Sequence, residues 1–249
     1  MELVRDEIKS LIKNNVSIPQ ISKQLNVAKS TVYYHYKSIK GRKYSIPTIP
    51  EKDAVLGEFL GIFAGDGSLI LSKDYHYRIS IYLHANDDRE YANYIKELIQ
   101  NNFNKKVREY INENSLHLTF YSVDIYYLIK KYVNLYPHKT YNIYIKNPEK
   151  LSNKFLSYFI RGLFDTDGHH KKDGRLVLCL ASKKMIYQMS EILKTRFKIL
   201  SSVYKRNVKS PWKDQYELYI PKREVAKYRK EIGFSNKRKE RNKYASAGI

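Results

Sequence analysis

Two stretches of this chain carry the same pattern about a hundred residues apart, Phe59 to Gly67 (FLGIFAGDG) and Ile160 to Gly168 (IRGLFDTDG). Each is an apolar run with an internal glycine that ends in Asp-Gly, which predicts a helix with a carboxylate at its C-terminal end. The macrodipole of a helix is negative at that end and disfavours an anion by roughly 0.3–1 kcal/mol. We therefore expect a bound cation to compensate each carboxylate.

The segments that follow these two stretches repeat in the same order, and such a repeat decides the architecture. After each motif helix we expect a strand pair, an amphipathic helix, a second strand pair and a closing helix, with Ala85 aligned 96 positions before Ala181. The expected fold is α+β, with two αββαββα units in pseudo-twofold symmetry. The elements expected after the motif helices are 68–72, 77–85, 87–102, 107–111, 115–121 and 122–135 in the first copy, and a hairpin around 173–174, 175–182, 183–200, 201–206, 216–220 and 221–232 in the second.

Glycines recur every four residues in the first motif helix, at Gly57, Gly61 and Gly65. A glycine in a helix interior costs roughly 1 kcal/mol relative to alanine, so three in register need a structural reason. Close approach of the second motif helix through Gly162 supplies that reason. We expect the two motif helices to pack together at a seam, with their terminal carboxylates side by side.

The first forty residues predict a separate, small all-α domain. Helices are expected over 2–15, 18–25 and 28–39, with Asn26 in the left-handed conformation at a tight turn, the layout of a helix-turn-helix. This stretch resembles the helix-turn-helix domains of recombinases and bacterial regulators, and a helical hairpin that only packs is the alternative. The expected organisation is a helix-turn-helix over 1–40, a basic linker over 41–52 and two halves over 53–150 and 151–249. The DNA-contact candidates here are Lys29, Ser30, Thr31 and Tyr34 in the third helix, and Lys40, Arg42 and Lys43 around the linker.

The charge balance indicates a polyanionic partner. The chain has 46 Lys and Arg residues against 25 Asp and Glu, a formal net charge of +21, which exceeds what solubility requires. No convincing basic amphipathic helix or lipidation site favours a membrane, so we expect nucleic acid. Cys179, the single cysteine, is expected to be a small buried hydrophobe rather than a nucleophile. With a charged N-terminus and no run of roughly 18 apolar residues, the protein is expected to be soluble and intracellular, in cytoplasm, nucleoid or organelle.

Two carboxylates brought together repel each other unless they share a divalent metal. Mg²⁺ prefers hard oxygen ligands and bridges phosphate oxygens, which suits metal-assisted hydrolysis of a phosphodiester. A single Asp-Gly is an ordinary turn signal, but two in matching helices of a strongly basic chain favour catalysis. The expected cofactor is Mg²⁺, with Mn²⁺ as a substitute and Ca²⁺ binding without efficient turnover. The candidate metal residues are Asp66 and Asp167 with their predecessors Gly65 and Thr166.

The two stretches resemble the motifs of the LAGLIDADG homing endonucleases, over residues 53–245. In the second copy Gly162 and Asp167 occupy demanding positions of the family motif, and Asp165 matches its earlier acidic residue. The first copy departs at Ala64, where that acidic residue would be. The resemblance implies a monomeric, Mg²⁺-dependent, site-specific endonuclease that cuts both strands of a long double-stranded DNA target.

The resemblance also implies a catalytic basic residue after the last helix of each half. Lys139 follows Asp66 by 73 residues and Lys239 follows Asp167 by 72; each is alternatively a plain phosphate contact. It further implies a saddle of two antiparallel sheets over the DNA major groove, read by alternate strand residues, where a one-residue shift would exchange reading and core positions. The candidates are Tyr75, Tyr77, Arg78, Ser80, Tyr82 and Asn86 in the first half, and Lys171, Lys172, Arg175, Ser182, Lys205, Arg206, Lys209 and Trp212 in the second.

Two other functions fit parts of the sequence. A transcription regulator that kept the fold without cleavage fits the helix-turn-helix, although the retention of both terminal Asp residues argues against it. An intron RNA maturase fits the basic surface, because charge does not distinguish RNA from DNA. The chain lacks an N-terminal Cys or Ser and a C-terminal His-Asn, so we do not expect a self-splicing intein.

Overall fold

The computed structural model describes residues 2–40, 50–72, 76–206 and 214–241, and the chain divides into a unit of residues 1–46 and a unit of residues 47–249. The first unit has its own small core of Ile8, Ile12, Ile21 and Val32. Asn26 adopts a left-handed conformation (φ 47°), as the sequence predicts. The helices of this unit are α1 (Glu2–Lys13), α2 (Ile18–Gln24) and α3 (Lys29–Lys40).

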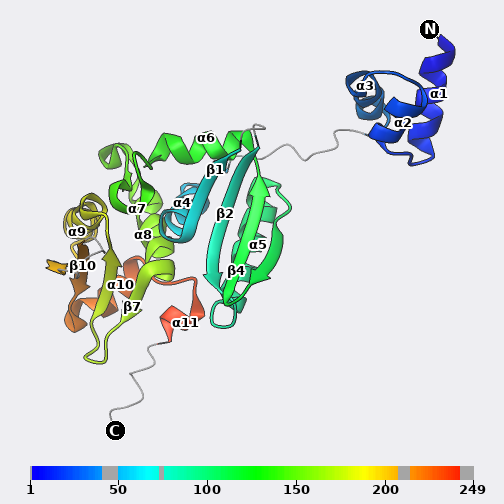
Figure 1. Cartoon of the computed structure of the whole chain (residues 1–249). Coiled ribbons are helices and arrows are strands. Elements are labelled where there is room, and N and C mark those ends of the chain that lie inside the picture. The colour runs from blue at the N-terminus through cyan, green and yellow to red at the C-terminus, as the bar shows by residue number, and fades with distance from the viewer. Residues whose placement is uncertain (1, 41–49, 73–75, 207–213, 242–249) are drawn as a thin grey trace. The chain divides into compact units, whose positions relative to one another are not determined.

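Two helices that pack side by side form the centre of the second unit, α4 (Asp53–Asp66) and α8 (Asn153–Asp167), with a sheet on either side (Figure 1). Their backbones approach closely through glycine: a Cβ at Gly61 would lie 2.1 Å from the Phe159 carbonyl oxygen, and one at Gly162 would lie 2.5 Å from the Glu58 carbonyl oxygen. The predicted glycine-lined seam is therefore confirmed.

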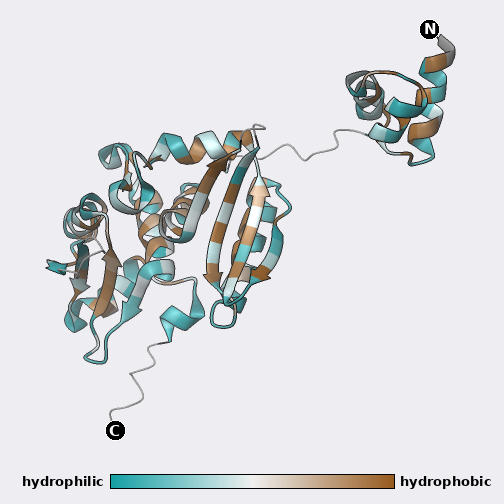
Figure 2. Ribbon diagram, in the orientation of Figure 1, coloured by the Kyte–Doolittle hydropathy of each residue, from teal (hydrophilic) through white to brown (hydrophobic). Residues whose placement is uncertain are grey.

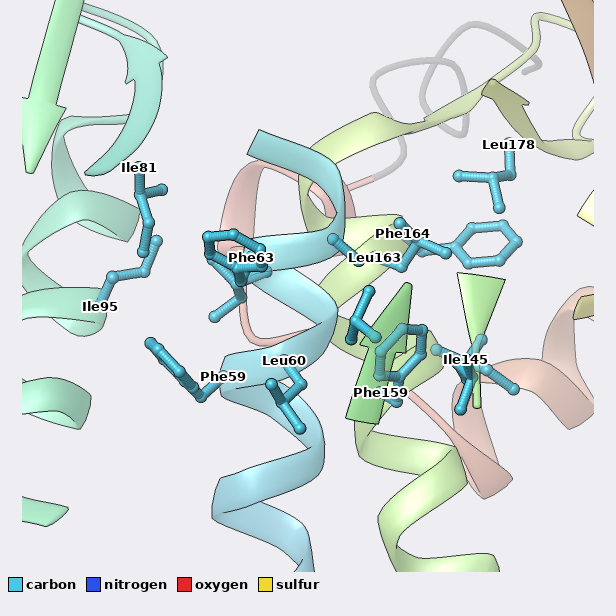
Figure 3. Close-up of a cluster of buried hydrophobic side chains, with 14 of the residues drawn as sticks. Phe59, Leu60, Phe63, Ile81, Ile95, Ile145, Phe159, Leu163, Phe164 and Leu178 are labelled. Carbon is cyan, nitrogen blue, oxygen red and sulfur yellow. The ribbon is translucent and has the colours of Figure 1, made fainter. Parts of the chain in front are cut away.

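Each motif helix sends its large side chains away from the seam (Figure 3). Phe59 and Phe63 of α4 point toward Ile81 and Ile95, whereas Phe159 and Phe164 of α8 point the other way. All four phenylalanine rings are fully buried. The seam and the cores under the two sheets therefore form one continuous apolar cluster.

The first half contains a four-stranded antiparallel sheet of order β1-β2-β4-β3. Ile79, Ile81 and Leu83 of β2 are buried in the core, and the residues between them form the opposite face, which appears as alternating bands in Figure 2. The elements after α4 are β1 (Gly67–Leu71), β2 (Tyr77–His84), α5 (Arg89–Phe103), β3 (Arg108–Asn112), β4 (Ser115–Tyr121) and α6 (Val123–Tyr132).

The second half repeats this arrangement with a sheet of order β7-β8-β10-β9. Gly174, at φ +86°, closes the turn predicted between the first two strands. The elements after α8 are β7 (Gly168–His170), β8 (Leu176–Leu180), α9 (Lys183–Phe197), β9 (Ser202–Arg206), β10 (Gln215–Ile220), α10 (Lys222–Glu231) and α11 (Lys237–Glu240). The α+β fold of two repeated units is confirmed.

The connection between the halves differs from the prediction. The helix predicted over 122–135 ends at Tyr132, because Val133 pairs with Ile145 in a short antiparallel ribbon and the Tyr132 carbonyl accepts from the Lys146 amide at 2.8 Å. The connecting elements are β5 (Val133–Asn134), α7 (Lys139–Asn142), β6 (Tyr144–Ile145) and a 3₁₀ turn, η1 (Pro148–Lys150). Among the helices that the structure describes, none is long and apolar enough to span a membrane.

Candidate active site

The two motif helices end together at the seam, each in an aspartate followed by glycine. A Cβ at Gly65 would lie 2.0 Å from Thr166 Oγ1 and 2.5 Å from Asp167 Oδ2, so the end of α4 lies directly against the end of α8. Asp66 and Asp167 are close enough for their charges to affect each other's titration. The structure therefore brings the two predicted carboxylates together, as the repeat requires.

A lysine closes the C-terminal end of each motif helix. Lys139 Nζ donates to the carbonyl oxygens of Gly65 at 2.7 Å and Gly67 at 2.6 Å. Lys239 Nζ donates to the equivalent carbonyl oxygens, of Thr166 at 3.2 Å and of Gly168. Each ammonium group thus compensates the negative end of a helix dipole. Part of the positive charge expected at the end of each motif helix therefore comes from a lysine of the chain itself.

Burial dominates the electrostatics of these four groups. Burial and then repulsion from Asp167 raise the pKa of Asp66 to about 7, and burial raises the pKa of Asp167 to about 6. Burial lowers the pKa of Lys139 to about 8, and it also lowers the pKa of Lys239. The ionised carboxylates are therefore costly without a further positive charge.

The site has the features of a seat for a divalent cation. Asp167 Oδ2 is buried and, within the described residues, has no hydrogen-bond partner. Gly65 has no Cβ that would crowd this oxygen, since a Cβ there would lie 2.5 Å from it. The Gly65 and Thr166 carbonyl oxygens accept from the lysines and keep a second lone pair. No group of three or more His, Cys, Asp or Glu side chains gathers within the described ranges, so a metal here would depend on the two aspartates, carbonyls and water.

Asp165, two residues before Asp167, has a different structural role. It is 1% exposed, and burial raises its pKa to about 8. Its Oδ2 accepts from the Ser235 amide at 2.9 Å, and its carbonyl oxygen accepts from Asn236 Nδ2 at 3.2 Å. Asp165 therefore binds the segment that leads to Lys239. Its counterpart Ala64 has no side-chain oxygen and so has no equivalent of the bond to the Ser235 amide.

The sheet face opposite the helices, called the open face below, carries several predicted DNA-contact residues of the first half. Arg78, Ser80 and Tyr82 alternate with the core residues of β2 and lie on this face. The Ser80 hydroxyl is buried and pairs with Thr119 Oγ1 at 3.0 Å, so it is already occupied. Placing Tyr77 on this face was wrong, because it shares the phase of Ile79 and its ring packs on Tyr126 and Tyr127 of α6.

The second sheet carries more charge on its open face. Arg175 lies in phase with Val177, stacks over Tyr219 with 4.9 Å between its guanidinium carbon and the ring centre, and pairs with Asp173 at 2.7 Å. Arg206 lies 3.7 Å from Glu217 on the same face. These partly exposed ion pairs are weak enough for phosphates to compete with them. Lys171 and Lys172 lie at the β7–β8 turn.

Two predicted contacts of the second half, Lys205 and Ser182, do not lie on the open face. Lys205 lies in the core phase, with Val203 and Tyr216, and pairs with Asp214 at 2.6 Å at the sheet edge. Ser182 is fully buried as the N-cap of α9, where its hydroxyl accepts from the Met185 amide and donates to the Ile143 carbonyl oxygen. Asn86, its counterpart in the first half, is exposed.

Cys179 is not the fully buried side chain that its apolar neighbours suggest. It is half-buried on the open face, and Sγ lies 3.5 Å from Gln215 Oε1. Burial raises the pKa of the thiol, which disfavours the thiolate.

The remaining predicted contacts belong to α3 or to undescribed segments. Lys29, Ser30, Thr31 and Tyr34 are all exposed, with Tyr34 70% exposed, and Lys40 Nζ bonds Asn15 Oδ1 at 3.2 Å. Arg42, Lys43, Tyr75, Lys209 and Trp212 lie outside the described residues.

Sequence reasoning missed several polar residues of the open faces. In SLHLTFY the core residues Leu116 and Leu118 put His117 on the open face, where its ring packs against Tyr82 and Tyr110. That alternation is visible in the sequence and was the available signal. The missed open-face residues include His84, Arg108, Tyr110, His117, His169, Tyr204, Glu217 and Tyr219.

Comparison with known folds agrees with this geometry. Residues 154–233 match the family model described as LAGLIDADG-like domain. A structure of mesophilic variants of the homing endonuclease I-DmoI superposes with a TM-score of 0.56 at 18% identity, covering 73% of this chain and 96% of that one. I-DmoI in complex with DNA and Ca gives a TM-score of 0.56 at 18% identity over 72% of this chain and 89% of that one.

Relatives by sequence carry quite different names. The chain is 29% identical over 239 residues to a probable translation initiation factor IF-2 of Methanocaldococcus jannaschii, covering 93% of this chain and 19% of that protein. It is 28% identical over 199 residues to the DNA-directed RNA polymerase subunit Rpo1C of the same organism, covering 78% of this chain and 21% of that one. The chain thus spans about a fifth of the length of these relatives.

Proposed function

We propose that this chain, which has a LAGLIDADG homing endonuclease-like fold, is a site-specific endonuclease that hydrolyses both strands of double-stranded DNA with divalent metal. The observation that carries the proposal is the pair of helix-terminal aspartates, each beside a partly buried lysine, on a chain with net charge +21. Since one chain supplies both carboxylates, it acts as a monomer, with one Asp-Lys pair for each DNA strand.

Asp66 and Asp167 would hold the metal, together with the carbonyl oxygens of Gly65 and Thr166. The metal, Mg²⁺ or Mn²⁺, would supply a polarised phosphate oxygen and a water of lowered pKa. Lys139 and Lys239 keep the two helix ends in place through their carbonyl bonds and present positive charge to the phosphate. The lowered pKa of Lys139, about 8, also brings proton exchange at this group close to neutral pH.

The names of the relatives support this function. A translation initiation factor and an RNA polymerase subunit share a segment similar to this chain, although the segment is only about a fifth of each protein. A segment found in proteins of unrelated roles behaves as an insertion. A nuclease that cuts a defined site is the kind of protein that allows a DNA element to enter new locations.

Binding of the target is assigned to the open faces of the two sheets, with the helix-turn-helix unit extending the footprint. The open faces combine Arg78 and Tyr82 in the first half with Arg175 and Arg206 in the second, groups that reach base edges and phosphates. The exposed residues of α3 suit a separate DNA contact. Affinity should fall steeply with salt as counterions are released.

The test is cleavage of DNA from a randomised target library with Mg²⁺, with each strand labelled separately. The intact chain should cut both strands, and Asp66→Asn or Asp167→Asn should lower the rate by at least about a thousandfold while leaving DNA affinity within about threefold. Ca²⁺ in place of Mg²⁺ should support binding without efficient cutting. As a matched control, Glu191→Gln removes an exposed carboxylate of the second half on α9, away from the open face, and should cut normally.

Binding of duplex DNA without cleavage across the library would instead identify a transcription regulator. Preference for structured RNA over duplex DNA in direct competition would identify a maturase, because RNA and DNA differ at the 2′-hydroxyl and in groove shape. Either result contradicts the endonuclease.

A further inference from the structure

The segment that carries Lys239 is held mainly by polar bonds. Phe234 is its last apolar anchor, packed on Tyr228 and His170. The following residues, 235–238, border a cavity of about 360 Å³ against α5 rather than a packed core. The position of Lys239 therefore depends on the hydrogen bonds of these few residues.

Those bonds come from both halves of the molecule. Asp165 of the second half accepts from the Ser235 amide. Glu58, on α4 of the first half, accepts from the Ser235 hydroxyl. Asp88, also of the first half, accepts from Arg238 at 2.7 Å and from Asn236 Nδ2 at 3.3 Å. Hydrogen bonds across the seam thus connect the segment that carries Lys239 to the first half.

Glu58 is an unusual residue for its position. It is 3% exposed in a helix whose other buried residues are apolar, and burial raises its pKa. Burying a carboxyl group in such a place costs stability unless hydrogen bonds compensate it. Besides Ser235, its side chain also bonds Tyr94, so Glu58 links α5 and the Lys239 segment to the motif helix.

Different residues support the segment that carries Lys139. In the repeat, Glu58 corresponds to Phe159 and Asp165 corresponds to Ala64. The Lys139 segment is held by other groups: Asn134 Nδ2 donates to the carbonyl oxygens of Tyr136 at 2.9 Å and Asn142 at 3.0 Å, and the Ser182 hydroxyl donates to the Ile143 carbonyl oxygen at 2.6 Å. The two lysines are placed alike and supported differently.

We propose that Glu58 is a positioning residue for Lys239, acting through Ser235, so that cutting of one DNA strand by the second half depends on a side chain of the first half. This inference rests on the proposed endonuclease function. Glu58 is 3% exposed and lies eight residues before Asp66 on α4, so its effect reaches the reaction through the Ser235–Lys239 segment.

The variants distinguish loss of the Glu58–Ser235 hydrogen bond from a general loss of stability. Glu58→Met removes the acceptor at similar length, and Glu58→Gln keeps an acceptor oxygen. Ser235→Ala removes the same bond from a partly exposed residue that is easier to change. Asn134→Ala is the matched control for the Lys139 segment.

The experiment measures the nicking rate of each strand separately, together with DNA affinity, in the full chain. Glu58→Met and Ser235→Ala should slow the strand that Asp167→Asn also slows most, by about tenfold, with the other strand within about twofold and affinity unchanged. Glu58→Gln should restore most of the rate, and Asn134→Ala should slow the opposite strand. Equal slowing of both strands, or of neither, overturns the proposal.

Hydrogen exchange of the amides of 235–239 gives a result that does not depend on cutting. If the intact chain cuts no DNA, the proposed function fails. Hydrogen exchange alone then tests whether the Glu58–Ser235 bond holds the Lys239 segment in place. Faster exchange at 235–239 with unchanged exchange at 138–142 in Ser235→Ala supports it. Equal exchange in the variant and the parent chain overturns it.

Discussion

The two motif helices end in the same way and are supported in different ways. Each ends in Asp-Gly, and each terminal turn is closed by a lysine that donates to two carbonyl oxygens. The residues that support these two lysines are not symmetric. Asp165 bonds the segment before Lys239, whereas Ala64 makes no such bond. The groups expected to do chemistry are duplicated, and the groups that hold them are not.

The open faces of the sheets differ in a similar manner. The first has neutral and aromatic side chains such as Tyr82, Tyr110 and His117 packed together. The second has ion pairs such as Arg206 with Glu217. A duplicated backbone therefore presents two different surfaces, which suits a DNA target whose two halves differ in sequence.

The largest expected effect tests the seam that both halves share. Gly61→Ala should destabilise the chain by about 3 kcal/mol or more, because the new Cβ would meet the Phe159 backbone at 2.1 Å and the helices would have to separate. Gly65→Ala should cost less, about 1–2 kcal/mol, since the two nearest atoms, Thr166 Oγ1 and Asp167 Oδ2, are side-chain ends that can rotate, and only Thr166 Cβ, at 2.8 Å, is fixed to the backbone. Urea unfolding monitored by circular dichroism measures both, and equal losses would contradict a backbone-limited seam.

The second prediction asks whether the acidic residue missing from the first motif can be restored. Ala64→Asp would bury a carboxyl at a position that is 4% exposed, without the partner that Ser235 provides to Asp165. It should destabilise the chain by about 2–3 kcal/mol. Asp165→Ala is the matched change, and it should also speed hydrogen exchange at 235–239. A stable Ala64→Asp variant would show that the first half can accommodate an equivalent bond.

The repeat was sufficient to predict the motif helices and the glycine seam, because both depend on local pattern. Lys139 and Lys239 were predicted from the resemblance to the LAGLIDADG homing endonucleases, with their matching spacing from Asp66 and Asp167 as a check. The β5–β6 ribbon was not predictable, since two-residue strands carry no periodic signal. The bond from Asp165 to Ser235 joins residues 70 positions apart, and neither residue type alone indicates it. Tyr77 and Lys205 were placed on the wrong sheet face, because an error of one residue in strand phase exchanges the two faces.

The third prediction concerns the repulsion at the seam. In the metal-free chain the pKa of Asp66 is raised from 3.8 to about 7, so the folded state binds its proton more tightly than the unfolded state does. Stability should therefore fall as pH rises from about 4 to about 7. Asp66→Asn should flatten part of this slope and stabilise the chain at neutral pH by about 1–2 kcal/mol. Melting temperatures in EDTA from pH 4 to 8 measure this.

Glu58 and Asp165 titrate with the same sign and leave a residual slope in that variant. Added Mg²⁺ should raise the melting temperature of the parent chain and not that of Asp66→Asn. A steeper slope in Asp66→Asn than in the parent chain would contradict mutual repulsion of the two carboxylates.

The smallest expected effect separates two residues that the repeat aligns, Asn86 and Ser182. Ser182 caps α9 and is fully buried, so Ser182→Ala should cost about 1 kcal/mol of stability, as loss of an N-cap does. Asn86 is exposed in the turn before α5, so Asn86→Ala should leave stability within about 0.5 kcal/mol. Titration of duplex DNA at two salt concentrations then decides whether Asn86 contributes to binding. Weaker binding by Asn86→Ala, with Ser182→Ala binding normally, would assign the DNA contact to the first half alone.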